Sequence, residues 1–229
     1  MNTTPDCSPI ASIVSRLVTE FRGKLAKTIL APFTPSSGVG RRLGGNEYLW
    51  FDLSRLIVEK LKRASKRHDA LHNLLRHTPA VERIVTFTEH LPKVCEKYLT
   101  RLGDEQALAI RSRCQRVDGR WQQIPMMDFA CDVRPRHLDL LKEVFANEEW
   151  RRKYCPGVIL QSGNSYHFYG FKLLTQVQWV EFLGRCLLLS PYCDSRFIAH
   201  CLVAGACQLR ISVDSTRHEP PHVVAELPG

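Results

Sequence analysis

The feature that most constrains the fold is a pair of apolar runs separated by four turn-forming residues. The run "VILQ" ends at Gln161, "SGNS" occupies residues 162–165, and "YHFYGFKLL" begins at Tyr166. Ser, Gly and Asn between two β-like runs are typical of a hairpin turn. We therefore expect two adjacent antiparallel strands joined by this polar turn.

The chain after Thr78 alternates segments with strand-like and helix-like patterns. Strands are expected at residues 82–90, 108–117, 120–133 and 207–214. Helices are expected at residues 91–103, 134–150, 175–190 and 195–205. This order predicts an α+β fold in which helices pack on a mostly antiparallel sheet.

The first 80 residues differ from the rest, and we expect a helical N-terminal extension at 1–80 and a separate core at 81–229. Apolar residues at helical spacing predict one helix over residues 9–30, and a second helix is expected over 47–77. The second helix carries a basic face that suits a phosphate backbone, although solvated basic faces are as common. Its basic residues are Lys60, Lys62, Arg63, Lys66 and Arg67.

Charge and cysteine content indicate the partner and the compartment. The formal net charge of +9 favours a polyanionic partner. The nine cysteines are odd in number and form no CxxC pair, which is typical of buried thiols in a reducing compartment. A cluster of possible zinc ligands comprises Cys186, Cys193, His200, Cys201 and Cys207. Its spacing matches no standard zinc site, so structural zinc is the weaker interpretation.

Neither a membrane span nor a secretory signal is apparent. No run reaches the roughly 18 apolar residues that a spanning helix requires. The opening residues "MNTTPDCSPI" lack the basic start and apolar centre of a signal peptide. We expect a cytoplasmic protein.

Three polar segments fall at the ends of expected strands: "DFACD" (128–132), "SGNSYH" (162–167) and "VDSTR" (213–217). Carboxylates at such places suit Mg²⁺ or Mn²⁺, which prefer oxygen ligands and leave positions open for phosphates. A turn with Ser and Gly offers N–H groups and hydroxyls to a phosphate, and a histidine adds a donor or a positive charge. Together these segments predict a nucleotide site.

The pattern Ser162-Gly163-x-x-Tyr166-His167, between an aspartate-bearing strand and a later strand ending in Asp214, resembles the motifs of the archaeo-eukaryotic primase superfamily. The superfamily has an "hhhDhD" first motif, an "SG…sxH" second motif and an "hD" third motif. The resemblance covers roughly residues 82–227 and implies an RRM-like primase catalytic core. It does not extend to the first third of the chain.

The resemblance implies template-directed nucleotidyl transfer from a nucleoside triphosphate on a single-stranded nucleic-acid template, with two divalent ions, Mg²⁺ or Mn²⁺. It assigns the catalytic and metal-binding roles to Asp128, Asp132 and Asp214. It assigns binding of the triphosphate to Ser162, Gly163, Ser165 and His167. Arg217 would neutralise the charge that develops in the reaction.

The first motif departs from the family pattern. Three residues separate Asp128 from Asp132, and Ala130 stands where the second carboxylate is expected. On a flat strand, four steps of about 3.3 Å place the two aspartates about 13 Å apart, whereas the ions of a two-metal site lie about 3.5–4 Å apart. Either a bulge or bend brings Asp132 back, or one of the two is not a ligand.

Other interpretations of the same residues stay open. Asp132 could cap the helix that starts near Pro135, Asp214 could make a turn, and His167 could be a packed core residue. The aromatic residues of the hairpin could stack on bases or build the core: Tyr166, Phe168, Tyr169 and Phe171. At the level of function, the alternatives are a catalytically inactive nucleic-acid-binding module of the same fold and a metal-dependent nuclease or phosphodiesterase.

Overall fold

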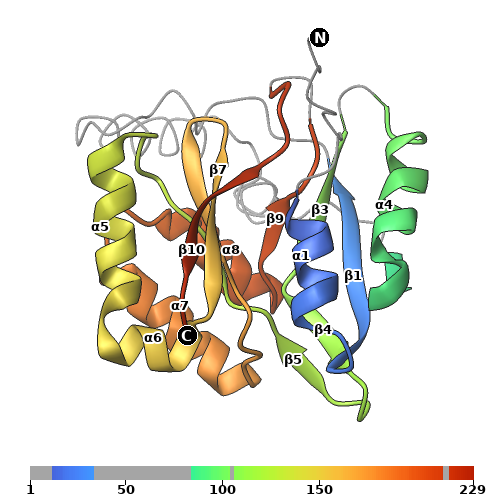
Figure 1. Ribbon diagram of the computed structural model, residues 1–229, viewed down its shortest axis with the longest axis horizontal. Coiled ribbons are helices and arrows are strands. Elements are labelled where there is room, and N and C mark those ends of the chain that lie inside the picture. The colour runs from blue at the N-terminus through green and yellow to red at the C-terminus, as the bar shows by residue number, and fades with distance from the viewer. Residues whose placement is uncertain (1–11, 34–83, 104–105, 214–216) are drawn as a thin grey trace, which may run out of the picture. The chain divides into compact units, whose positions relative to one another are not determined.

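A computed structural model describes residues 12–33, 84–103, 106–213 and 217–229 of the chain. These residues belong to one compact unit. They form two antiparallel sheets with helices packed beside them (Figure 1). The expected α+β class with antiparallel sheets is therefore confirmed.

The larger sheet has six strands. Strand β1 lies at its centre, with β2 on one edge and both β3 and β4 on the other. Strand β9 pairs with β3, and β5 pairs with β4. The strands are β1 (Leu25–Phe33), β2 (Ile84–Phe87), β3 (Ala107–Arg111), β4 (Arg113–Arg116), β5 (Trp121–Gln123) and β9 (Gln208–Arg210).

The smaller sheet has the order β10-β7-β8-β6. Its strands are β6 (Met126–Asp128), β7 (Gly157–Ser162), β8 (Ser165–Gly170) and β10 (His222–Leu227). The hairpin β7–β8 closes at the pair Ser162 and Ser165, as the turn composition predicts. Gly163 occupies this turn with φ +64°, a left-handed conformation that favours glycine.

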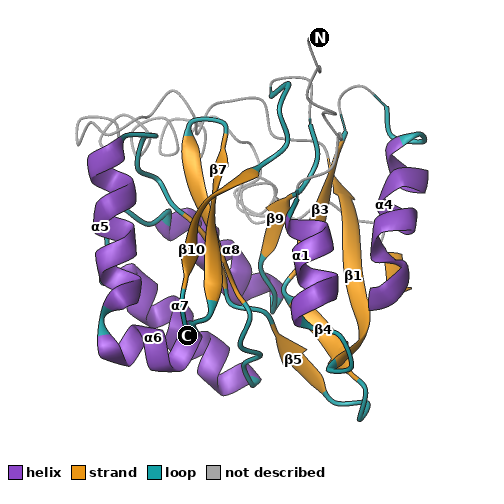
Figure 2. Cartoon of the chain, viewed as in Figure 1, coloured by secondary structure: helices purple, strands orange, loops and turns teal. Residues whose placement is uncertain are grey.

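The helices flank the two sheets (Figure 2). They are α1 (Ile13–Glu20), α4 (Leu91–Leu99), α5 (Pro135–Ala146), α6 (Glu148–Tyr154), α7 (Gln176–Leu187) and α8 (Ser195–Ala204), with a short 3₁₀ turn η1 (Thr88–His90). Figure 2 shows α1 and α4 beside the larger sheet and α5 and α6 beside the smaller one. Among the described residues, none of these helices has the length and apolar composition of a membrane span.

Local sequence explains where several of these helices begin. The Thr175 hydroxyl accepts from the backbone N–H of Gln178, whose side chain accepts from the backbone N–H of Thr175, so α7 starts with a capping box. The expected helix over residues 134–150 is two helices, because Asn147 leaves the helical conformation and caps α6. The other helices predicted after residue 90 are confirmed.

The expected helix over residues 9–30 is wrong in its second half. The apolar spacing predicts helix α1 correctly, but Gly23 has φ +70° and reverses the chain. Residues 25–33 then pair on both edges as β1, and this pairing outweighs the local helical pattern. Residues 13–33 thus belong to the core and not to a separate extension. The second expected helix, 47–77, and the boundary at residue 80 lie outside the described residues.

The hydrophobic core includes the aromatic residues of the hairpin. Phe168 stacks on Phe145 of α5 with ring centroids 4.1 Å apart. The exposed fraction is at most 6% for each of Tyr166, Phe168, Tyr169 and Phe171. Their interpretation as core residues is therefore confirmed, and stacking of these rings on bases is excluded by burial.

Candidate active site

The pairing of β6 with β8 brings the first and second polar segments together. Asp128 at the end of β6 lies opposite His167 of β8. The distance from Asp128 Oδ1 to His167 Nε2 is 3.5 Å. The carboxylate side chain is 32% exposed and the imidazole only 5%, so Asp128 faces solvent above a buried histidine.

The His167 imidazole is neutral. Burial, with smaller contributions from Arg210 and Arg217, lowers its pKa to about 3. The contact with Asp128 is therefore not an ion pair, because burial and the two arginines outweigh the carboxylate. Within the described part of the chain, His167 Nδ1 has no hydrogen-bond partner. His167 therefore brings a neutral imidazole to this place and not the positive charge that the sequence also allowed.

The buried side of the hairpin turn is held by an arginine. Arg210 Nη2 donates to Ser162 Oγ over 3.2 Å, and both residues are almost fully buried. Arg210 also donates through Nη1 to the carbonyl oxygens of Ser212 and Glu219. These bonds tie the turn of the smaller sheet to the end of β9 in the larger sheet.

A second arginine lies against the exposed side of the turn. A Cβ atom on Gly163 would stand 3.3 Å from Cδ and from Nε of Arg217. Gly163 and Asn164 are exposed, and Ser165 is half-buried. The Ser165 hydroxyl donates to the Ser162 carbonyl over 3.5 Å, a long hydrogen bond. The exposed backbone of the turn and the half-buried Arg217 side chain therefore lie next to each other.

Asp132 has a different environment from Asp128. After Asp128 the chain pairs with residues before α8, through the bridge of Phe129 with Cys193 and the bond from Ala130 N–H to the Tyr192 carbonyl. Asp132 then lies in an exposed loop, where its carboxylate forms an ion pair with Arg134 at 3.2 Å. Its side chain is 59% exposed. Asp214, the third expected carboxylate, lies outside the described residues.

The donor atoms near Asp128 bear on the metal-binding expectation. The described residues contain no group of three or more His, Cys, Asp or Glu that could hold a metal ion. Asp128, half-exposed at a strand end, has the chemistry of one Mg²⁺ or Mn²⁺ ligand. The described residues thus fit a single carboxylate ligand and not a complete two-metal site.

The cysteine cluster is a set of buried thiols. Burial and a hydrogen bond with Cys193 raise the pKa of Cys186, and burial and a hydrogen bond with Cys207 raise that of Cys201. All the described cysteines are free and buried: Cys95, Cys114, Cys131, Cys155, Cys186, Cys193, Cys201 and Cys207. The raised pKa values of Cys186 and Cys201 disfavour the thiolate form that zinc requires at these two residues.

Sequence reasoning missed Arg210 and the hydroxyl of Tyr169. Arg210 stands between the apolar residues Leu209 and Ile211 at the end of β9, and a charge between two apolar residues is the signal that could have identified it. Tyr169 lies two residues after His167 on β8, and burial strongly raises its pKa, with a further contribution from Asp128. Among the described residues, its hydroxyl has no hydrogen-bond partner.

Comparison with known proteins gives one match. A family model described as "AEP-like: Archaeo-eukaryotic primase 1D-like" matches residues 86–223, which is more than half of the chain. The matched range contains β6, the hairpin β7–β8 and β9, and the resemblance seen in the motifs is thereby confirmed. No curated protein and no solved structure matches the chain.

Proposed function

The chain belongs to the archaeo-eukaryotic primase 1D-like family, and on this premise we propose that it is a primase-like nucleotidyltransferase that binds a nucleoside triphosphate at the turn of residues 162–165. The observation that carries the proposal is the position of Arg217 against Gly163. A glycine in a left-handed turn lets a ligand approach the backbone, and a guanidinium group beside it is suited to phosphate oxygens.

Some residues at the turn are proposed to contact the nucleotide, and others hold the turn in position. The exposed turn residues Gly163 and Asn164, the half-buried Ser165, and Arg217 are the proposed triphosphate contacts. The guanidinium group supplies charge-assisted hydrogen bonds to phosphate oxygens. The buried Arg210 holds the turn in place through its hydrogen bond to Ser162.

His167 is proposed as a positioning residue. Only 4% of it is exposed and its Nε2 faces Asp128, so it orients the carboxylate from below. The neutral state of the ring suits this role, because a neutral N–H donor fixes a carboxylate without neutralising its charge.

Asp128 is proposed as the carboxylate of the first motif that binds Mg²⁺ or Mn²⁺, with Asp214 as the expected second ligand. Divalent ions at such a site lower the charge on the attacking and leaving oxygens of nucleotidyl transfer. Asp132 is left out of this proposed set, because its exposed carboxylate is paired with Arg134 and not with His167. A single-stranded nucleic-acid template is the proposed second substrate.

Incorporation of labelled nucleotides on a homopolymer template, with Mg²⁺ or Mn²⁺, tests the activity. Asp128→Asn is expected to lower incorporation about 100-fold or more, because several kcal/mol of charge stabilisation are lost and each 1.4 kcal/mol is about tenfold. Asp132→Asn, in the same segment, is expected to stay within about twofold of the wild type. Equal loss in both variants, or no incorporation with either ion together with no nucleotide binding, contradicts the proposal.

A second candidate function is a catalytically inactive module that binds nucleotide or nucleic acid. It is favoured by the first motif, which supplies Asp128 alone, with Ala130 and an exposed Asp132 in place of a second carboxylate. Nucleotide binding that is unchanged in Asp128→Asn, combined with no incorporation by the wild type, selects this function over the first.

A further inference from the structure

Four side chains form a row across one face of the larger sheet. Lys27 of β1 pairs with Phe87 of β2 on one edge and with Gln115 of β4 on the other. Gln115 in turn pairs with Trp121 of β5. Directly paired residues on adjacent strands point to the same face, so Phe87, Lys27, Gln115 and Trp121 make a single line, called the aromatic row below. Three strand spacings make the row about 14 Å long.

Both ends of the aromatic row carry an exposed ring with a cation over it. Phe87 is 54% exposed and Trp121 is 44% exposed. Lys27 Nζ lies 5.9 Å from the centroid of the Phe87 ring, and Arg113 Cζ lies 4.9 Å from the centroid of the Trp121 ring. A single exposed apolar side chain needs no explanation. Exposed rings with basic side chains beside them at both ends of one row suit an anionic ligand with aromatic groups.

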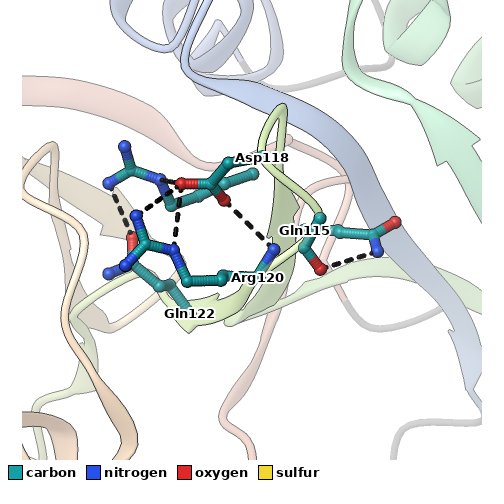
Figure 3. Close-up of polar contacts among 6 residues, drawn as sticks. Gln115, Asp118, Arg120 and Gln122 are labelled. Atoms are coloured by element: carbon teal, nitrogen blue, oxygen red, sulfur yellow. Dashed lines mark hydrogen bonds and ion pairs between the residues drawn. The ribbon is translucent and has the colours of Figure 1, made fainter.

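The hairpin that carries Trp121 is held by polar contacts (Figure 3). Asp118 forms ion pairs with Arg116 at 3.2 Å and with Arg120 at 2.8 Å. Gln115 Nε2 donates to the Gly119 carbonyl over 2.9 Å in the same turn. A ring on a hairpin fixed in this way loses little freedom when a ligand stacks on it, which favours binding.

The aromatic row lies on the same face of the larger sheet as the arginine that holds the nucleotide turn. Ala31 pairs with Ala109 of β3, and Ala109 pairs with Arg210 of β9. Lys27 and Ala31 are four residues apart on β1 and therefore point to the same face. Their rows lie about 13 Å apart along the strand.

We propose that the aromatic row binds single-stranded nucleic acid, with bases stacked on Phe87 and Trp121 and phosphates contacted by Lys27 and Arg113. Stacking on exposed rings beside basic side chains is the physical basis of binding single strands without sequence preference. The net charge of +9 complements such a ligand. The role of this surface in holding a template rests on the proposed function, whereas the binding itself does not.

Fluorescence anisotropy of a labelled oligothymidylate measures this binding. Phe87→Ala and Trp121→Ala are each expected to weaken it about 5- to 150-fold, the range for loss of one base–aromatic stack. Val85→Ala is the matched control, because Val85 is 52% exposed on the same strand and face but has no ring. Trp121→Phe keeps an aromatic ring and is expected to retain most of the affinity. Unchanged thermal unfolding of all four variants shows that each is folded.

The salt dependence separates phosphate contacts from stacking. Lys27→Met and Arg113→Met are each expected to reduce the slope of log K against log salt by about 0.7, the value for one phosphate contact on a single strand. Phe87→Ala is expected to leave that slope unchanged. Slopes that are unaffected in both cation variants overturn the assignment of phosphate contacts to these residues.

Three results overturn the proposal: no binding of the oligonucleotide by the wild type, equal weakening by Val85→Ala and Phe87→Ala, or full affinity in the Phe87→Ala/Trp121→Ala double variant. Equal weakening by the valine control indicates a general apolar face that docks protein. Failure here is distinct from failure of the proposed function, because nucleotide binding at Gly163 is measured separately. Loss of oligonucleotide binding with intact nucleotide binding rejects the aromatic row alone.

Discussion

Asp128 and His167 face each other across the β6–β8 ladder, with 3.5 Å between Oδ1 and Nε2, yet the imidazole is uncharged. Burial removes the ring from water, and Arg210 and Arg217 further disfavour a positive charge on it. The pair therefore consists of a half-exposed carboxylate beside a buried, neutral imidazole.

The pH dependence of stability follows from the neutral His167. Its folded-state pKa of about 3 lies below the ordinary value of 6.5, so between these values the unfolded chain binds a proton that the folded chain does not. The stabilising contribution is fully present above about pH 6.5 and is lost as pH falls toward 3, with a slope that approaches about 1.4 kcal/mol per pH unit.

Urea unfolding at a series of pH values checks this dependence in the wild type and in His167→Gln. The variant is expected to show a shallower loss of unfolding free energy below pH 6.5 because it lacks the titrating ring. The same slope in both proteins contradicts a neutral, buried His167.

Removal of the Ser162 hydroxyl is expected to destabilise the fold. Ser162→Ala leaves one N–H group of the buried Arg210 without its acceptor, at a cost of about 1–3 kcal/mol. Ser165→Ala in the same turn removes only a long hydrogen bond from a half-buried hydroxyl, and is expected to change stability by less than about 0.5 kcal/mol. Chemical denaturation of the two variants measures the difference, and equal costs would contradict a structural role for the Arg210–Ser162 bond.

Gly163 is expected to be required both for the turn and for the place of Arg217. Gly163→Ala puts a Cβ atom 3.3 Å from the guanidinium arm, on a backbone with φ +64°. Gly205→Ala is the matched control, because Gly205 has φ +67° and no neighbouring atom within 4 Å of an added Cβ. Both variants are expected to lose about 1–2 kcal/mol of stability from the left-handed backbone.

Only Gly163→Ala is expected to weaken nucleotide binding, because only this change displaces Arg217 from the turn. Calorimetric titration with a nucleoside triphosphate at a temperature where both variants are folded makes the comparison. Equal affinity in the two alanine variants argues against contact between the nucleotide and this turn.

The parts of the fold that local sequence determines were predictable. The hairpin β7–β8 follows from "SGNS", and α7 and α8 follow from their apolar spacing and from capping residues such as Thr175 and Asp194. Strand β1 was not predictable, because its conformation depends on pairing with strands from later in the sequence. Strand β10 was missed for a different reason, since its mostly half-buried residues give no clear alternation.

The site was predictable where a motif is local and not where it depends on tertiary contact. The meeting of Asp128 with His167 follows from the order of the motifs and is seen in the β6–β8 register. The environment of Asp132 depends on how the chain leaves β6, and the burial of Ser162 depends on Arg210. Neither contact can be predicted from the spacing of residues in the sequence.

The affinity of Arg217→Met for a nucleoside triphosphate, measured by calorimetric titration beside the wild type, tests the central claim most directly. Loss of charge-assisted hydrogen bonds is expected to weaken binding about tenfold or more, while Arg22→Met, the same change at an exposed arginine after α1, leaves it unchanged. The wild type is also expected to bind the triphosphate more tightly than the bare nucleoside. Equal affinities in the two arginine variants, or no preference for the triphosphate, would contradict a triphosphate site at the Gly163 turn.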